Sequence, residues 1–266
     1  MKYKLIIYML ILIISLLFAS ISAAAPYFRG TGLMNIPTAY VKSEGIFDLG
    51  MHLSAVDQRR DELAIRMDFG IFNFVELGLM ELKTEDSDYI LGNLKILLFR
   101  ESGSAPALSI GVDNFGEKVK NESESYERSA YGVMSKRFNL PVVHIIGGHL
   151  GIGNRRYIAK TSIGKYLHGV FMGLSKDFYL SFLNSRLRLM CELDGRDLNV
   201  GLHYAMSSGL SVSFAVGELV SSSEDIKYYL GLSFTNEPVI DDINQLSKQI
   251  IKAVTLINQS RPDTDR

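Results

Sequence analysis

Apolar and polar residues alternate along most of the chain, with the period of two that sends successive strand side chains to opposite faces. In the segment from Ile46 to Val56, one face is apolar and consists of Phe47, Leu49, Met51 and Leu53. The other face is polar or small and consists of Asp48, Gly50, His52 and Ser54. Similar segments recur as far as Phe234. They give about twelve strands of roughly 9–11 residues, the length that crosses an outer membrane.

The contrast between the two faces favours a membrane barrel over a soluble β-sandwich, which also alternates. The polar face carries charged residues and glycine, whereas the apolar face is almost free of charge. Contact with lipid demands such a face, and in hydrocarbon only a helix or a closed barrel pairs every backbone polar group. We therefore predict an all-β fold, a transmembrane antiparallel up-and-down β-barrel over residues 46–235.

The connections between the predicted strands alternate in length. Short turns rich in Gly, Pro, Asn and Ser fall at residues 70–73, 100–105, 139–141 and 206–209. Longer polar connections fall at residues 114–127, 154–166 and 218–225. Barrels of the outer membrane have short periplasmic turns and longer outer loops. With an even number of strands, we expect both termini in the periplasm.

Beyond the last strand the apolar spacing changes to three and four residues, which is one face of a helix. The apolar positions are Val239, Ile243, Leu246, Ile250, Val254 and Ile257. Pro238 suits the first helical position, and Asp241 and Asp242 suit the first turn. The sequence predicts a short C-terminal periplasmic helix and tail over residues 236–266. Three arrangements of this helix are compatible with the sequence: packing on the barrel, plugging its lumen, or contact with a partner in the periplasm. The alternative is a poorly ordered tail.

The start of the chain has the pattern of a secretory signal peptide. Lys2 and Lys4 precede an apolar run over residues 5–19, and small residues follow. We predict a signal peptide over residues 1–24, because the run is shorter than the ~20 apolar residues of a membrane-spanning helix; an uncleaved anchor is the alternative. Residues 25–45 then form a periplasmic or lumenal segment, and the protein is expected in the outer membrane of a diderm bacterium.

Composition and motifs exclude several classes of function. Lys and Arg number 28 against 29 Asp and Glu, so no basic excess points to nucleic acid. The single cysteine, Cys191, cannot form an internal disulfide. No nucleophile elbow, zinc-protease motif, phosphate loop or cysteine pair occurs. We expect no enzyme activity, catalytic residue, metal or cofactor. Ser54 with His52 comes nearest to a catalytic pair, but any serine-rich barrel offers such pairs.

The polar face of the predicted strands supplies the candidate functional residues. A path for a substrate would be lined by Asp48, His52, Arg66, Asp68, Glu76, Lys95, Arg186, Arg188, Glu192, Asn199 and His203. Opposite charges fall on adjacent strands, which allows two interpretations. They line a route for a polar, anionic substrate, or they neutralise one another and fill the barrel. A lumen of about twelve strands lies between a packed eight-strand interior and an open porin.

Two segments carry a resemblance to a known family. Residues 30–41 read GTGLMNIPTAYV, and residues 192–204 read ELDGRDLNVGLHY. They resemble the YjbH-like family of outer-membrane proteins in a glycine, apolar, P-T-A signature and in an acidic, D-G, N-x-G strand-turn-strand motif. The matching residues are Gly30, Gly32, Pro37, Thr38, Ala39, Asp194 and Gly195. The resemblance covers residues 27–234, although the chain is shorter than the larger members and adds the helical tail.

This resemblance implies a barrel connected with exopolysaccharide production or export. From its residues alone, the P-T-A segment is tight, non-helical backbone, and we expect it to tuck into the periplasmic mouth. The leading hypothesis is export or surface assembly of an exopolysaccharide or a similar polar polymer. The alternatives are a structural or adhesive surface barrel with a filled lumen and, third, an outer-membrane enzyme.

The expected partners follow from the predicted location. They are outer-membrane lipid, the barrel-assembly machinery and glycan-export proteins in the periplasm, without nucleic acid. Phe234 ends the last predicted strand. An aromatic residue there resembles the signal by which the assembly machinery recognises its clients.

Overall fold

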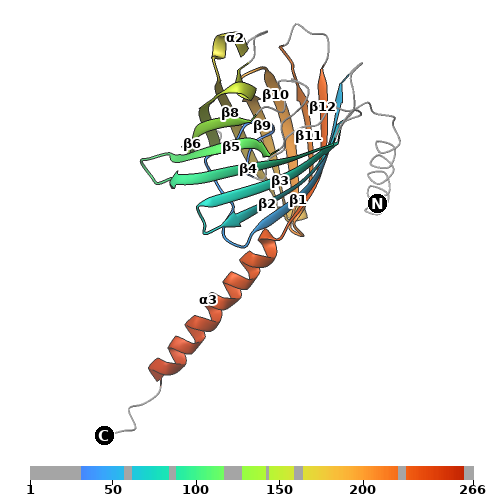
Figure 1. Ribbon diagram of the computed structural model, residues 1–266. Coiled ribbons are helices and arrows are strands. Elements are labelled where there is room, and N and C mark those ends of the chain that lie inside the picture. The colour runs from blue at the N-terminus through green and yellow to red at the C-terminus, as the bar shows by residue number, and fades with distance from the viewer. Residues whose placement is uncertain are drawn as a thin grey trace.

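The computed structural model describes residues 31–56, 62–83, 88–116, 128–141, 144–158, 164–220 and 226–260. Over these residues twelve strands form one closed barrel (Figure 1). The strands are β1 (Phe47–Val56), β2 (Glu62–Ile71), β3 (Val75–Lys83), β4 (Asp88–Phe99), β5 (Ala107–Gly116), β6 (Ser129–Leu140), β7 (His144–Gly153), β8 (Val170–Leu180), β9 (Ser185–Leu193), β10 (Leu198–Met206), β11 (Leu210–Gly217) and β12 (Lys227–Thr235). The helical elements are η2 (Arg155–Tyr157), α2 (Gly164–Leu167), η3 (Ser181–Leu183) and α3 (Glu237–Ser260). The predicted signal peptide lies outside the described residues.

Each strand pairs antiparallel with its neighbours in the chain, and β1 closes the barrel on β12. The closing seam runs from the Asp48–Thr235 pair to the Val56–Lys227 pair without a register shift. Closure leaves no strand edge unpaired. The predicted up-and-down barrel is therefore confirmed, and the β-sandwich is excluded.

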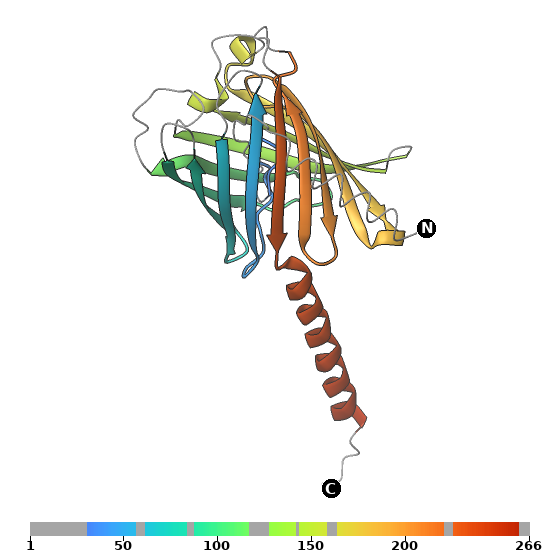
Figure 2. The same ribbon diagram turned by 90° about the vertical axis from the view of Figure 1, so that its right-hand side faces the viewer.

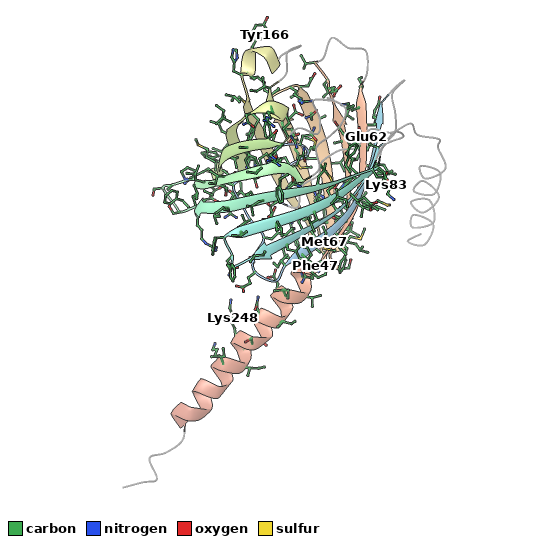
Figure 3. All side chains as sticks on the ribbon, viewed as in Figure 1. Phe47, Glu62, Met67, Lys83, Tyr166 and Lys248 are labelled. Atoms are coloured by element: carbon green, nitrogen blue, oxygen red, sulfur yellow. The ribbon has the colours of Figure 1, made fainter. Side chains whose placement is uncertain are left out.

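The barrel has two different ends. The chain enters β1 and leaves β12 at the same end, as an even strand number requires, and α3 begins there (Figure 2). Phe47 and Met67 lie near this helix end, whereas Tyr166 of α2 stands beyond the opposite, loop end (Figure 3). Short turns join β2 to β3 and β10 to β11 at the helix end, over residues 72–74 and 207–209.

The outer face of the barrel is apolar, as the alternation predicted. Large apolar side chains more than a third exposed occur all around it, including Leu49, Met51, Ile65, Leu79, Ile110, Met134, Leu150, Leu174, Leu189, Leu202, Phe214 and Leu232. A continuous surface of this kind would aggregate in water, whereas it is the surface that lipid contact requires. The architecture is that of a transmembrane β-barrel.

Helix α3 extends away from the barrel (Figures 1 and 2). Its apolar residues Val239, Ile243, Ile250 and Ile251 are exposed. It therefore neither packs on the wall nor plugs the lumen. No helix in the described part of the chain combines the length and apolarity needed to cross a membrane.

The lumen is occupied by the chain itself. Residues 31–46, here called the plug, run inside the barrel before β1 begins, and residues 32–39 are all buried. The plug lies deeper than the sequence predicted, because its tip reaches Glu192 and Asp194 on the far wall. The physical reason is its apolar content, since Leu33, Met34 and Ile36 leave water completely only inside the barrel.

Candidate functional site

The tip of the plug is bound by one carboxylate of the barrel wall. Glu192 on β9 accepts hydrogen bonds from the backbone N–H groups of Met34 at 3.0 Å and Asn35 at 2.7 Å. The side-chain amide of Asn199 on β10 donates to the same carboxylate at 3.1 Å. A buried carboxylate needs such compensation, because it loses its hydration inside the barrel. Glu192 thus holds the bent tip of the plug in place rather than forming part of an open channel.

The apolar side of the tip fits against glycine in the wall. A Cβ atom at Gly173 would lie 2.5 Å from Leu33 Cδ1 and 2.7 Å from Ile36 Cδ1. A Cβ atom at Gly201 would lie 2.6 Å from Met34 Sδ. Inward glycines on β8 and β10 therefore leave the space that the plug fills. Ring stacking continues the core beside it, with the Tyr157 and Phe171 centroids 4.6 Å apart.

The loop end of the lumen is closed above the tip. Arg156 of η2 donates to the Asn35 carbonyl at 2.9 Å, and the Tyr157 hydroxyl donates to Asp113 at 2.7 Å. Both η2 side chains are buried. The Asn35 side chain itself donates to Asp194 at 3.1 Å. These contacts cover the plug tip from the loop end.

The D-G motif forms the tight turn between β9 and β10. The Asp194 carboxylate accepts the backbone N–H groups of Arg196 at 3.0 Å and Asp197 at 2.9 Å. Gly195 has a φ of +86° and passes close to the Tyr157 backbone, so a side chain there would be strained and would clash. The motif thus builds the turn and also supplies an acceptor for the plug.

The returning arm of the plug is held by hydroxyl groups. Ser135 on β6 accepts from the Ala39 N–H at 2.8 Å, and Ser109 on β5 donates to the Ala39 carbonyl at 2.6 Å. Within the plug, the Thr38 hydroxyl donates to the Thr31 carbonyl. In the T-A pair, Ala39 therefore fastens this arm to the wall, whereas Thr38 ties the two arms of the plug together. Pro37, which has no N–H to satisfy, is buried just before them.

Two groups of buried charges lie where the plug passes β1 to β4. Glu76 pairs with Lys95 at 3.2 Å and accepts from the Thr31 hydroxyl and the Lys42 N–H. Arg66 lies between Asp48 at 3.1 Å and Asp68 at 2.7 Å. Opposite charges at these distances offset the loss of hydration only as complete sets. For these groups the neutralising interpretation fits the geometry.

The plug leaves the lumen at the helix end beside Glu101. This carboxylate accepts from the Tyr40 hydroxyl at 2.9 Å and from the Arg137 N–H at 2.7 Å. Burial would raise the pKa of Glu101, but these hydrogen bonds and the Arg137 charge lower it below its usual value. Burial, together with the neighbouring Glu101, raises the pKa of Tyr40 to about 12. The phenol therefore stays a donor at neutral pH.

A cavity of about 550 Å³ remains at the helix end, between the plug and strands β6 to β9. We call it the inner vestibule, and its lining includes Tyr40, Arg137, His149, Ser175, Arg186 and Arg188. A smaller cavity of about 160 Å³ lies across the plug, beside His203 and Ser233. Arg186 and Arg188 line both cavities. Both cavities lie at the helix end of the barrel.

The predicted lumen residues divide into two sets. Eight are buried against the plug or one another: Asp48, His52, Arg66, Asp68, Glu76, Lys95, Glu192 and Asn199. Three are not fully buried and line cavities at the helix end: Arg186, Arg188 and His203. Asp48 and Arg66 of the buried set also border the smaller cavity. Ser54 and His52, the nearest approach to a catalytic pair, are both buried. No cluster of His, Cys, Asp or Glu among the described residues is arranged to hold a metal ion.

Several residues of the site were not singled out by sequence reasoning. They are Thr31, Glu101, Ser109, Asp113, Ser135, Arg156 and Tyr157. One signal could have located the plug: the twelve residues of GTGLMNIPTAYV carry no charge, which is unusual for a segment exposed to water. Gly30, the first motif residue, lies outside the described part of the chain.

Comparison with known proteins identifies no family. No family model and no curated protein matches the chain. Among solved structures it is similar to the KdgM porin, with a TM-score of 0.47 and 10% identity over 70% of this chain and 98% of that one. It is also similar to a loop-deletion mutant of OmpT, an outer membrane protein of Vibrio cholerae, with a TM-score of 0.33 and 7% identity over 71% and 98% of the two chains. Likeness at this level defines neither a family nor a substrate. The protein is defined by its own geometry as a transmembrane β-barrel filled by its N-terminal segment.

Proposed function

We propose that the protein is an outer-membrane barrel of a diderm bacterium that acts in the export or surface assembly of an exopolysaccharide or similar polar polymer. In this proposal the plug closes the lumen at rest and moves when the polymer passes. In this proposal the helix end, with α3, faces the periplasm, where glycan-export proteins deliver the polymer. The protein has no enzymatic role in this scheme.

One observation carries the proposal: the plug is attached to a polar wall by hydrogen bonds and ion pairs. Its anchors on the wall include Glu76, Ser109, Ser135 and Glu192. A wall of carboxylates and hydroxyls can be hydrated when the plug leaves, whereas a wall of apolar side chains could not. Withdrawal of the plug would turn the same groups toward a polar polymer.

Locking the plug tests this proposal. Ala39 and Ser135 are in contact through the Ala39 N–H and the Ser135 hydroxyl at 2.8 Å, so a cysteine pair at these positions can join plug and wall. The variant Ala39→Cys, Ser135→Cys is made with Cys191→Ser, because Cys191 is free and exposed. Channel openings in planar bilayers should disappear under oxidation and return under reduction. Ala39→Cys with Cys191→Ser, which cannot form the bridge, serves as the control.

The second candidate is a structural or adhesive surface barrel with a permanently filled lumen. The paired charges of Arg66 with Asp48 and Asp68 favour it, because they leave no charge available to a substrate. This function expects no openings from either the reduced or the oxidised protein, and no loss of polymer at the cell surface when the gene is deleted. Openings that persist in the bridged protein would also argue against the plug as the gate.

A further inference from the structure

The inner vestibule is richer in basic than in acidic side chains. Its basic lining consists of Lys42, Arg137, Lys176, Arg186 and Arg188, and its acidic lining of Asp177 and Glu237. Four of these five cations have an ion-pair or hydrogen-bond partner. Arg137 pairs with Glu101 at 2.9 Å, Arg188 with Asp177 at 2.7 Å, and Lys42 with Asp48 at 3.7 Å. The Lys176 ammonium donates to the Ile145 carbonyl.

Arg186 differs from these cations. It is exposed to the vestibule and forms no ion pair with any residue in the described ranges, including Glu237, which lines the same cavity. Its cross-strand partner on β8 is Tyr179, not an acid. Arg188 lies two residues away on the same face of β9, with its side chain 29% exposed beside Asp177. The vestibule therefore offers one guanidinium without an ion-pair partner, Arg186, and beside it a second, Arg188, which shares the Asp177 carboxylate.

Neutral hydrogen-bonding groups surround this cation. The lining contains the hydroxyls of Thr38, Ser43 and Ser175 and the imidazole of His149. His149 lies 2.8 Å from the Ser135 hydroxyl and 3.3 Å from that of Ser175. A volume of about 550 Å³ falls within the range of roughly 300–1,000 Å³ that holds small ligands. The combination suits a ligand with many hydroxyls and few negative charges.

We infer that the inner vestibule binds a carboxylate-bearing segment of an oligosaccharide chain, with Arg186 receiving the carboxylate. The planar guanidinium matches a carboxylate in a two-point contact. One guanidinium without an ion-pair partner offers a contact for one carboxylate, whereas a phosphate monoester carries a charge nearer two. The hydroxyls around it meet those of the sugar. This inference rests on the proposed function, because it names the polymer class that the barrel would handle.

The site also touches the plug. Thr38, Tyr40 and Lys42 belong to the plug and line the vestibule. A bound saccharide would therefore lie against the arm that Ser109 and Ser135 fasten to the wall. Binding precedes passage in this arrangement, so it is measurable while the lumen is still closed.

Calorimetric titration of the full, detergent-folded chain tests the inference. The probes are a hexamer of glucuronic acid, neutral maltohexaose and inorganic phosphate. We expect the glucuronate hexamer to bind, with an affinity that falls as NaCl rises, and the other two to bind at least about tenfold more weakly. Arg186→Gln should weaken glucuronate binding about tenfold, and Arg186→Glu should abolish it. Arg100→Gln, at a turn of the same end and outside the vestibule, should leave it unchanged.

Three outcomes would overturn the inference. The first is that maltohexaose binds as tightly as the glucuronate hexamer, which would show that the carboxylate does not contribute to recognition. The second is that phosphate binds as tightly, which would show a general anion site. The third is an unchanged affinity of Arg186→Glu for the glucuronate hexamer. The proposed function fails separately. Saccharide binding without channel openings in bilayers would contradict the gating role of the plug and support the saccharide site. Channel openings without saccharide binding would contradict the site and support the gating role.

Discussion

Glu192 and Asn35 are joined by a 2.7 Å hydrogen bond from the Asn35 N–H to the Glu192 carboxylate, across 157 residues of sequence. The two residues belong to the two segments that carry the family resemblance, so the motifs contact each other in the folded protein. The first motif supplies a plug and the second supplies its receptor on β9. A relation between two short sequences thus becomes one structural unit.

Removing that carboxylate should loosen the plug tip. In Glu192→Ala the N–H groups of Met34 and Asn35 lose their acceptor, at a cost of about 1–3 kcal/mol for each buried donor. Hydrogen exchange at these two amides should accelerate by at least about tenfold. The exchange rates in Glu192→Gln should lie between those of the parent protein and those of Glu192→Ala. Glu81→Ala, at an exposed ion pair with Lys83, is the control. Unchanged protection in Glu192→Ala would mean that the carboxylate does not hold the tip.

Filling the space at Gly173 should displace the plug without touching its hydrogen bonds. A valine there would collide with Leu33 and Ile36, and overpacking of this kind costs about 1–3 kcal/mol. We expect more frequent channel openings in planar bilayers. Gly132→Val is the matched control, because a Cβ atom at Gly132 meets nothing within 4 Å. If both variants stay as closed as the parent protein, the plug is not the gate.

The lipid-facing assignment predicts an asymmetry between arginine substitutions. Leu202, at the middle of β10, is 37% exposed on the apolar outer face. Leu202→Arg should destabilise the barrel in lipid by about 2–4 kcal/mol, measured by urea unfolding in vesicles. Ser175→Arg, which faces the inner vestibule, should cost much less. Asn199 is unsuitable as the inward control, because it is buried against Glu192 and Asp194. Similar losses from the two substitutions would contradict the assignment.

The C-terminal helix should be dispensable for insertion. The apolar residues of α3 do not pack against the barrel, whereas the ring of Phe234 in β12 lies 6.2 Å from that of Phe47 across the closing seam. Deleting residues 237–266 should leave the amount of heat-modifiable barrel in cell membranes unchanged. Phe234→Ala should lower it, both by weakening the seam and by removing the proposed assembly signal. Failure of the truncated chain to insert would place α3 in the folding unit.

Alkaline pH should release the returning arm. The phenol of Tyr40 ordinarily has a pKa of 10.0, and burial beside Glu101 raises it to about 12. Because the folded state favours the neutral phenol, its contribution to plug stability is complete below pH 10 and is lost as the pH rises toward 12. Protease cleavage within the plug should increase over this interval. In Tyr40→Phe the same interval should show no step, and a step that remains would belong to another group.

The sequence predicted the wall of the barrel better than its contents. Alternation with period two determines which side chains point inward, so the faces of Asp48 and Leu49 could be assigned residue by residue. The plug has no such period. Its depth depends on the glycines at positions 173 and 201 and on Glu192, all more than a hundred residues away. Local patterns contain no information about which distant wall accepts such a segment.

The same limit applies to the charges. Opposite signs on adjacent strands predicted pairing correctly for Glu76 and Lys95. They did not predict that Arg186 would lack an ion-pair partner, because Arg188, two residues further along β9, forms the ion pair with the nearby Asp177. Strand register and side-chain rotamers determine which cation stays without an ion-pair partner, and neither can be predicted from the local sequence.

Asn236 connects the base of α3 to the base of the plug. Its side chain accepts from the Phe47 N–H at 2.8 Å and donates to the Gly45 carbonyl at 3.0 Å. The 24-residue helix beyond it is a lever about 36 Å long, at about 1.5 Å per residue. Because the same asparagine forms the connection to α3 and fixes the start of β1, we expect a displacement of the helix to reach the rim where the plug joins the barrel wall.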